Sequence, residues 1–174
     1  MAAINKKYDT LFLDRDGVLN KKIDDGYVLK EEDIEILLGI SEFLKFIRSQ
    51  FSQILVVTNQ RCIGLGLIDY NEVIKLNQSI DKKTGSFIDY FYVCPHLNED
   101  NCVCRKPKTG LFFYALEDYP IDFQNSWMIG DSVTDIIPAK ELGLRTILIS
   151  SGSNPIADIH IESTKDLLGL PEWE

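Results

Sequence analysis

Short apolar runs and amphipathic stretches alternate along this chain. The runs that we expect to form buried strands lie at 11–13 with Tyr8 before them, 53–58, 87–94, 126–130, 145–149 and 156–161. Apolar residues at helical spacing predict helices at 39–50, 69–83, 109–118 and 134–142, with Ser41 and Asp69 capping the first two and Ser163 capping a last short helix. This alternation predicts an α/β fold: a doubly wound, mainly parallel sheet of about six strands with helices on both faces.

The chain shows no internal repeat, low-complexity tract or long linker, so we expect a single domain over 1–174. No long insertion follows the first or the third expected strand, which argues against a separate cap domain. The loops at 20–33, 60–68 and 94–108 are then left to shape any pocket.

The balance of charges limits what the protein can bind. Hydrophobic residues make up 45% and charged residues 26%, as in ordinary soluble domains, and the net charge is −9. This acidity argues against a nucleic-acid surface and against anionic membranes, and no apolar run approaches the ~20 residues of a membrane span. The N-terminal segment at 1–10 lacks the apolar core of a signal peptide, so we expect a cytoplasmic protein, and we expect a monomer.

A pair of carboxylates follows the first expected strand. Asp14 and Asp16 come directly after its apolar run, and Gly17 permits a sharp turn. Open α/β sheets bind their ligands at the carboxyl ends of the strands. One interpretation is a polar strand end with an Asp-Gly turn. The other is a site in which the carboxylates hold a divalent cation or divide nucleophilic and acid–base work.

Polar or ligating side chains also end three other expected strands. Thr58, Cys94 and Asp131 occupy these positions, and the carboxyl ends of the strands share one edge of a doubly wound sheet. Residues far apart in the sequence therefore meet at one site. If Asp14 and Asp16 only formed a turn, this meeting would be a coincidence. Thr58 offers a hydroxyl and a backbone N–H to a phosphate oxygen.

A further acid and a lysine complete this set. Asp131 and Asp135 can join Asp14 in a carboxylate cluster that binds Mg²⁺, although an acid near a helix N-terminus is also common for its effect on the helix. Lys106 can reach a substrate phosphate or a nucleophilic carboxylate, whereas a surface lysine is the ordinary alternative.

Three of the four cysteines fall within one short segment. Cys94, His96, Cys102 and Cys104 supply a complete tetrahedral set of ligands for structural Zn²⁺. A disulfide between Cys94 and one of the other two cysteines is the alternative, and it is rare in a reducing compartment. We expect zinc to hold the loop at 94–108 and thereby to place Lys106.

These elements resemble the four motifs of the haloacid dehalogenase (HAD) superfamily of phosphatases. In the order of that superfamily the motifs correspond to Asp14-Arg15-Asp16-Gly17, Thr58, Lys106, and Gly130-Asp131 with Asp135. The resemblance implies that Asp14 attacks phosphorus to form an aspartyl phosphate, and that Asp16 protonates the leaving alcohol and then activates water. It also implies a Mg²⁺ held by Asp14, the Asp16 backbone carbonyl and Asp131, with Asp135 in support.

The zinc loop narrows the resemblance to one branch, which contains heptose bisphosphate phosphatases and histidinol-phosphate phosphatases. Gly26-Tyr27-Val28 and the loop Ile63-Gly64-Leu65-Gly66 are similar to the heptose enzymes, although Arg61-Cys62 stands where those usually have Ser-Gly. Cys94-Pro95-His96-Leu97 and the short spacer to Cys102 are similar to the histidinol-phosphate enzymes.

We therefore expect a Mg²⁺-dependent phosphatase that removes the C7 phosphate of a heptose 1,7-bisphosphate, with histidinol phosphate as the alternative substrate. The residues expected to bind the substrate are Asn59, Arg61, Arg105 and Lys108, the three cations by holding a second anionic group. Two other classes stay open. A binding module on an inactive phosphatase fold would need a lost catalytic residue, and a nucleic-acid 3′-phosphatase is disfavoured by the acidic balance.

Overall fold

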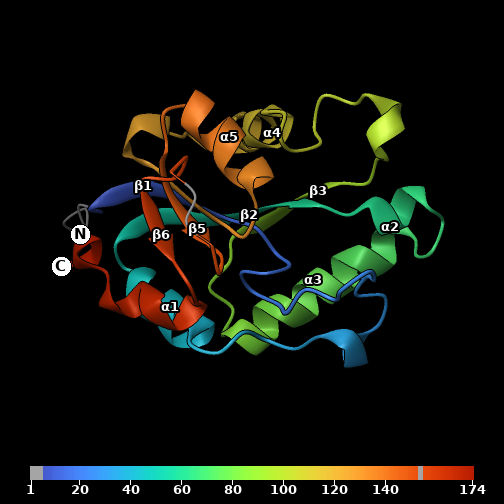
Figure 1. Ribbon diagram of the computed structural model, residues 1–174, viewed down its shortest axis with the longest axis horizontal. Coiled ribbons are helices and arrows are strands. Elements are labelled where there is room, and N and C mark those ends of the chain that lie inside the picture. Colours follow the sequence, from blue (N-terminus) through green and yellow to red (C-terminus); the bar gives the residue numbers. More distant parts are fainter. Residues whose placement is uncertain (1–5, 153–154) are drawn as a thin grey trace.

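The computed structural model describes residues 6–152 and 155–174, and one parallel sheet forms its centre (Figure 1). Its six strands lie in the order β3-β2-β1-β4-β5-β6, and every neighbouring pair is parallel. The strands are β1 (Tyr8–Leu13), β2 (Phe51–Asn59), β3 (Tyr90–Cys94), β4 (Trp127–Gly130), β5 (Arg145–Ile149) and β6 (Ile159–Ile161). Residues 1–5, part of the segment in which we expect no signal peptide, lie outside the described residues.

Helices cover both faces of this sheet. α4 and α5 lie on one face, and α1 and α3 lie on the other (Figure 1). The α-helices are α1 (Ile40–Ile47), α2 (Arg61–Gly64), α3 (Tyr70–Thr84), α4 (Gly110–Asp118) and α5 (Val133–Glu141); the 3₁₀ helices are η1 (Glu31–Asp33), η2 (Asn98–Asp100), η3 (Phe123–Asn125), η4 (Thr164–Gly169) and η5 (Pro171–Trp173). The expected doubly wound α/β fold is confirmed, and the described residues include no separate cap domain. No helix in the described part of the chain has the length and apolarity to cross a membrane.

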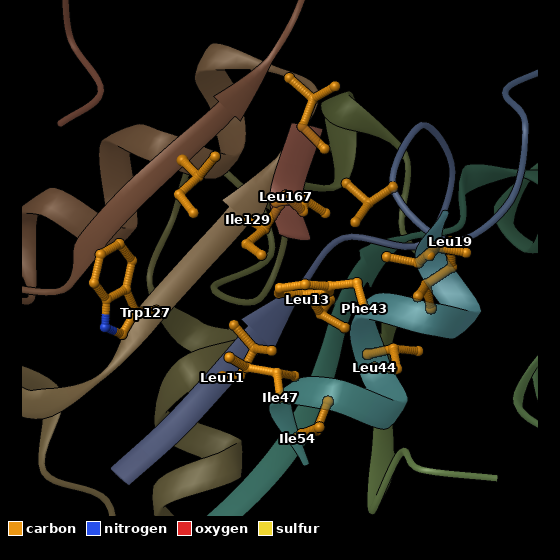
Figure 2. Close-up of a cluster of buried hydrophobic side chains, with 14 of the residues drawn as sticks. Leu11, Leu13, Leu19, Phe43, Leu44, Ile47, Ile54, Trp127, Ile129 and Leu167 are labelled. Carbon is orange, nitrogen blue, oxygen red and sulfur yellow. The ribbon is translucent and has the colours of Figure 1, made fainter. Parts of the chain in front are cut away.

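The end of β1 at 11–13 is buried on both faces, which explains why these three residues are all apolar. Leu11 and Leu13 pack on one side in a cluster that includes Phe43 of α1 (Figure 2). Phe12 packs on the other side against Phe112 of α4, with ring centroids 4.9 Å apart. Each fully buried side chain of this size contributes about 1.5–3 kcal/mol. The two clusters thus fix β1, and with it the position of the residues that follow Leu13.

The last residues of the chain complete the larger cluster. Trp173 is buried, and its ring centroid lies 4.9 Å from that of Trp127 and 5.7 Å from that of Phe43. Its Nε1 donates a hydrogen bond to Leu167 O at 2.7 Å, so the polar edge of the buried ring is satisfied. The C-terminal segment is therefore part of the core.

Asp158 ties β5 to the segment that precedes β6. Its carboxylate accepts hydrogen bonds from the Thr146 backbone N–H at 2.8 Å, Thr146 Oγ1 at 2.9 Å and Lys140 Nζ at 2.5 Å. Burial acts to raise the pKa of this carboxyl, but the hydrogen bonds from Lys140 and Thr146 outweigh burial and hold the pKa below its usual value. The ionised form of Asp158 therefore stabilises the fold.

Some boundaries differ from those expected. The N-cap of α1 is Gly39, with φ 89°, and Ser41 lies inside the helix, so the expected Ser41 cap is wrong. β3 begins at Tyr90 and not at residue 87, because Asp89 Oδ2 accepts the Ile54 N–H at 2.8 Å where a backbone ladder would continue. β6 is likewise shorter than the expected 156–161. The expected cap of α3 is confirmed, since the Asp69 side chain accepts the N–H of Glu72.

Candidate active site

The carboxyl ends of β1, β2 and β4 meet at one edge of the sheet, as expected. Asp14 directly follows β1, Thr58 lies near the end of β2, and Asp131 directly follows β4. The Asp14 N–H donates to Ile129 O at 3.0 Å, which extends the pairing of β1 with β4 by one residue. Asp14, Thr58 and Asp131 line one cavity of about 240 Å³.

Lys106 reaches this cavity from the loop at 94–108 and is only 3% exposed. Its Nζ lies 2.8 Å from Asp14 Oδ1 and 2.6 Å from Asp135 Oδ1, and it donates to Val57 O at 2.6 Å. Three acceptors thus satisfy the three donors of one ammonium group. Burial acts to lower the pKa of Lys106, but the charges of Asp135 and Asp14 prevail and raise it. The surface-lysine alternative is therefore wrong.

The cavity concentrates negative charge. Asp14, Asp131 and Asp135 each place a carboxylate oxygen within 4.8 Å of the others. Burial, together with Asp135 and Asp16, raises the pKa of Asp14 to about 6, although Lys106 acts against the shift. Burial and the charge of Asp14 also raise the pKa of Asp131. Two ammonium groups pair with these three carboxylates, that of Lys106 and that of the exposed Lys22, so the cluster keeps an excess of negative charge. A hard divalent cation with oxygen ligands fits this set of donors.

Two glycines let the acidic side chains approach the turns. A Cβ atom on Gly17, which has φ 98°, would collide with the carboxylate of Asp131. A Cβ atom on Gly130 would collide with the side chain of Asp135. The packing of the carboxylates therefore requires glycine at both positions.

Both carboxylate oxygens of Asp135 are engaged. Oδ2 accepts the Ser132 N–H at 3.1 Å as part of a capping box at the start of α5, and Oδ1 pairs with Lys106. A metal ion that bound Asp135 directly would have to displace one of these contacts. The geometry favours Asp135 as a support for Lys106 and for the turn that carries Asp131.

The two carboxylate oxygens of Asp16 have different surroundings. Oδ2 accepts hydrogen bonds from Arg15 Nη2 at 2.7 Å, Arg15 Nε at 3.1 Å and Gln60 Nε2 at 2.9 Å. Among the described residues, Oδ1 has only a long contact, from Asn20 Nδ2 at 3.5 Å. Asp16 also lines the cavity. One oxygen is thus anchored while the other is available for chemistry.

The end of β2 supports the loop that carries Lys106. Asn59 Nδ2 donates to Lys106 O, and the Lys106 N–H donates to Asn59 Oδ1, both at 3.0 Å. The amide that we expected to bind substrate is thus occupied in holding the Lys106 backbone. Thr58 Oγ1 accepts a hydrogen bond from Gln60 Nε2 at 2.8 Å, which links it to the anchor of Asp16.

Three cationic side chains besides Lys106 line the cavity, namely Lys22, Arg61 and Arg105. Lys22 was not among the residues expected at the site; it comes from the loop at 20–33, and its Nζ lies 3.0 Å from Asp131 Oδ2. Arg105 also lines a second cavity of about 430 Å³, and the two cavities share Asn59, Lys106 and Thr134 as lining residues.

Lys108 differs from the other expected substrate-binding cations. It lines the second cavity and not the first. Its Nζ donates to Asn101 O at 3.1 Å and to Cys102 O at 2.5 Å. Its ammonium group therefore braces the loop at 94–108, and Lys108 is not among the described residues that line the first cavity.

The four expected zinc ligands form a compact group beside the active site. The Sγ atoms of Cys94 and Cys104 lie 3.2 Å apart, and each lies 3.6–3.7 Å from Cys102 Sγ. His96 Nδ1 lies 3.6 Å from Cys94 Sγ and 3.3 Å from Cys104 Sγ. Zn–S bonds of ~2.3 Å in a tetrahedron separate the sulfurs by about 3.8 Å, so the donors fit zinc after a small expansion. All four cysteines of the chain are free thiols, so the disulfide alternative is wrong.

Comparisons with known proteins agree with this geometry. A family model described as "HAD-hyrolase-like" matches residues 103–168. A D-glycero-beta-D-manno-heptose-1,7-bisphosphate 7-phosphatase of Helicobacter pylori (strain J99) is 38% identical over 94% of this chain and 95% of its own length. The corresponding alpha-named enzyme of Campylobacter jejuni is 36% identical over 94% of this chain and 96% of its own.

The chain belongs to the family of D-glycero-D-manno-heptose-1,7-bisphosphate 7-phosphatases. It is therefore a HAD-like phosphatase, a phosphoric monoester hydrolase. A solved structure supports the fold: D,D-heptose 1,7-bisphosphate phosphatase from B. bronchiseptica, complexed with magnesium and phosphate. It aligns with TM-score 0.80 and 24% identity over 90% of this chain and 94% of that one.

In this heptose bisphosphate phosphatase family member, the cavity gathers most of the residues that the motifs indicated. The lining includes Asp14, Asp16, Thr58, Asn59, Arg61, Arg105, Lys106, Asp131 and Asp135. Gln60 and Lys22 were missed. Gln60 had a signal, its place directly after the last residue of β2, whereas the position of Lys22 depends on how the loop at 20–33 places it beside Asp131.

Proposed function

We propose that this chain removes the C7 phosphate from a D-glycero-D-manno-heptose 1,7-bisphosphate, with Asp14 as nucleophile and Asp16 as general acid and base. We take the substrate from the names of two relatives that match this chain over nearly their full length. The main support for this reaction is the ion pair between the buried Lys106 ammonium group and Asp14. The pair lies in a cavity that Asp16 and Asp131 also line.

The first step transfers the phosphoryl group to Asp14. Because Oδ1 of Asp14 accepts from Lys106, Oδ2 is the oxygen free to attack phosphorus. A bond forms between Oδ2 and phosphorus while the bond from phosphorus to the C7 oxygen breaks. Asp16 gives its proton to that oxygen, so the sugar leaves as an alcohol.

The second step releases phosphate. Asp16 is now ionised and takes a proton from a water molecule, whose oxygen attacks phosphorus as the bond to Asp14 breaks. Inorganic phosphate leaves, Asp14 returns to a carboxylate, and Asp16 again carries a proton. Thr58 binds and orients the phosphate in both steps, and Lys106 holds Asp14 and places a positive charge beside it.

Asp14, Asp131 and the Asp16 backbone carbonyl would hold Mg²⁺, which when bound neutralises the charge between the attacking carboxylate and the phosphate. Asp135 supports the site through Lys106. The excess of carboxylates over ammonium groups in the cavity supports this assignment, and the B. bronchiseptica relative is a complex with magnesium and phosphate.

Arg61, Arg105 and Lys22 bind the second phosphate of the substrate. All three line the cavity, and charge-assisted hydrogen bonds to phosphate are among the strong ones. Histidinol phosphate carries an ammonium at its far end, which these cations would repel. The electrostatics therefore favour a bisphosphate over histidinol phosphate.

Cys94, His96, Cys102 and Cys104 bind one structural Zn²⁺. The four donors leave no open coordination position, and Lys106 lies two residues beyond the last ligand. Zinc then fixes the loop that carries Lys106, Arg105 and the brace from Lys108.

The test is a comparison of kcat/KM, with Mg²⁺ present, for both anomers of the heptose 1,7-bisphosphate, the 7-monophosphate and histidinol phosphate. We expect one of the bisphosphates to exceed the other two substrates by at least about tenfold. Histidinol phosphate as the best substrate would contradict the proposal. Asp14→Asn serves as the inactive control.

A further inference from the structure

Arg15 is fully buried, although it lies between the two aspartates of the proposed mechanism. Its side chain is 1% exposed, whereas that of its neighbour Asp16 is 23% exposed. A guanidinium never loses its charge in proteins, so its burial requires partners. Arg15 is absent from the lining of the active-site cavity in the described structure, so it does not reach the substrate.

The guanidinium of Arg15 joins Asp16 to α3. Nε and Nη2 both donate to Oδ2 of Asp16, at 3.1 and 2.7 Å. Nη1 donates to Oδ1 of Asn77, a buried residue of α3, at 3.1 Å. The other end of that amide, Nδ2, has no hydrogen-bond partner within the described part of the chain. The described contacts of the Asn77 side chain are thus directed to Arg15.

Three donors from two residues converge on a single oxygen of Asp16. Besides the two from Arg15, Gln60 Nε2 donates to Oδ2 at 2.9 Å. A carboxyl oxygen that carries a proton becomes a donor, and it could not face three donors. The proton of the acid form must therefore lie on Oδ1, whose one contact is a long one from Asn20.

We infer that Arg15, held by Asn77, is a positioning residue that fixes the orientation of Asp16 so that Oδ1 is the oxygen that gives and takes the proton. This inference rests on the acid–base role of Asp16 in the proposed function. Without Arg15, Oδ2 of Asp16 keeps only the contact from Gln60 among the described residues, so the carboxyl group can turn over and either oxygen can carry the proton. The proton would then lie out of line with the leaving oxygen for much of the time.

Leaving groups of different basicity test this inference. A general acid accelerates the departure of a poor leaving group such as an alkoxide by about 10²–10⁴-fold, and a good leaving group needs it little. kcat/KM reports only the steps up to formation of the aspartyl phosphate, so it isolates this proton transfer. The substrates are the heptose bisphosphate and phenyl, 4-nitrophenyl and 2,4-dinitrophenyl phosphates, with Mg²⁺ present.

We expect Arg15→Met to lower kcat/KM by about 10- to 100-fold for the sugar phosphate and by less than about threefold for 2,4-dinitrophenyl phosphate. Because Asp16 also activates water in the second step, this variant should release a burst of about one nitrophenolate per chain. Asn77→Leu, which changes neither Arg15 nor Asp16, should show the same trend with a loss of about 3- to 10-fold. It keeps the inference testable if Arg15→Met does not fold.

Ile80→Val is the matched control, because Ile80 is buried in α3 but packs into the core cluster beside α1. It should lower the melting temperature while leaving the dependence on leaving group unchanged. Equal losses for all leaving groups in Arg15→Met and Asn77→Leu, or no loss at all, would overturn the inference. Asp16→Asn distinguishes a failure of this inference from a failure of the proposed function. If the loss in kcat/KM of Asp16→Asn is also the same for all leaving groups, the proposed acid–base role of Asp16 is itself wrong.

Discussion

Replacing Arg105 with alanine should reduce the preference of the enzyme for a bisphosphate over the 7-monophosphate. Arg105 borders both cavities, and its guanidinium is already held in place. Nε donates to Asn98 Oδ1 at 2.6 Å, and Nη1 donates to His96 O at 3.2 Å. Nη2 has no hydrogen-bond partner among the described residues and is available to a ligand. Because the other two contacts already order the side chain, binding a ligand costs little further side-chain entropy.

The size of the effect follows from the number of contacts that Arg105 can make. A single charge-assisted hydrogen bond contributes about 1.5–3 kcal/mol, which corresponds to roughly 10- to 100-fold in kcat/KM. We expect the variant to lose about this factor on the bisphosphate and little on the monophosphate. The ratio of the two kcat/KM values should therefore fall toward one.

Two controls make the assay specific. Lys108→Met removes a nearby cation whose ammonium is committed to loop carbonyls, so the ratio should stay close to that of the native enzyme. Zinc content should be measured in both variants, because Arg105 also contacts the zinc loop through His96 O. If Arg105→Ala retains zinc and the full ratio, Arg105 does not bind the second phosphate and our electrostatic reasoning is refuted.

Four further outcomes are expected. Asp14→Asn should abolish phosphate release while circular dichroism remains native, because the residue follows a strand and contributes little to the core; measurable turnover would contradict covalent catalysis. Freshly purified, reduced protein should contain about one zinc per chain by elemental analysis, and Cys104→Ser should lower both zinc content and activity. Trp173→Ala should destabilise the fold by about 3–5 kcal/mol in urea unfolding, because a buried indole is lost. Asp158→Asn should lower the melting temperature at pH 7; since the pKa of Asp158 is depressed in the folded state, its difference from the native protein should vanish as the pH falls below about 4.

The sequence predicted the fold well because periodicity and burial agree in this chain. The apolar run before Asp14 is continuous because β1 is covered on both faces, and that is the pattern of a central parallel strand. The ends of strands were predicted less accurately where a side chain replaces a backbone contact. Asp89 ends β3 early by accepting the Ile54 N–H, and nothing in the local sequence indicates that long-range bond.

Strand ends predicted the site for a similar reason, since topology alone brings Asp14, Thr58 and Asp131 to one edge. The loop residues were harder. Arg61 and Lys108 have the same charge and lie near motif residues, yet Arg61 lines the active-site cavity while Lys108 is bound to carbonyls of its own loop. Which cations remain available depends on contacts that form only after the chain has folded.

A charged side chain beside the site can bind a ligand only as far as its existing contacts leave it available. The three clustered carboxylates of Asp14, Asp131 and Asp135 outnumber the two ammonium groups that pair with them, those of Lys106 and Lys22, and a divalent cation would neutralise this local excess. Lys22 reaches Asp131 from an exposed loop, so it can move away when a metal or a phosphate arrives, whereas Arg15 is buried and cannot. Two cations beside the same motif thus have opposite uses: Lys22 is free to respond to ligand, and Arg15 is fixed to hold Asp16 in one orientation.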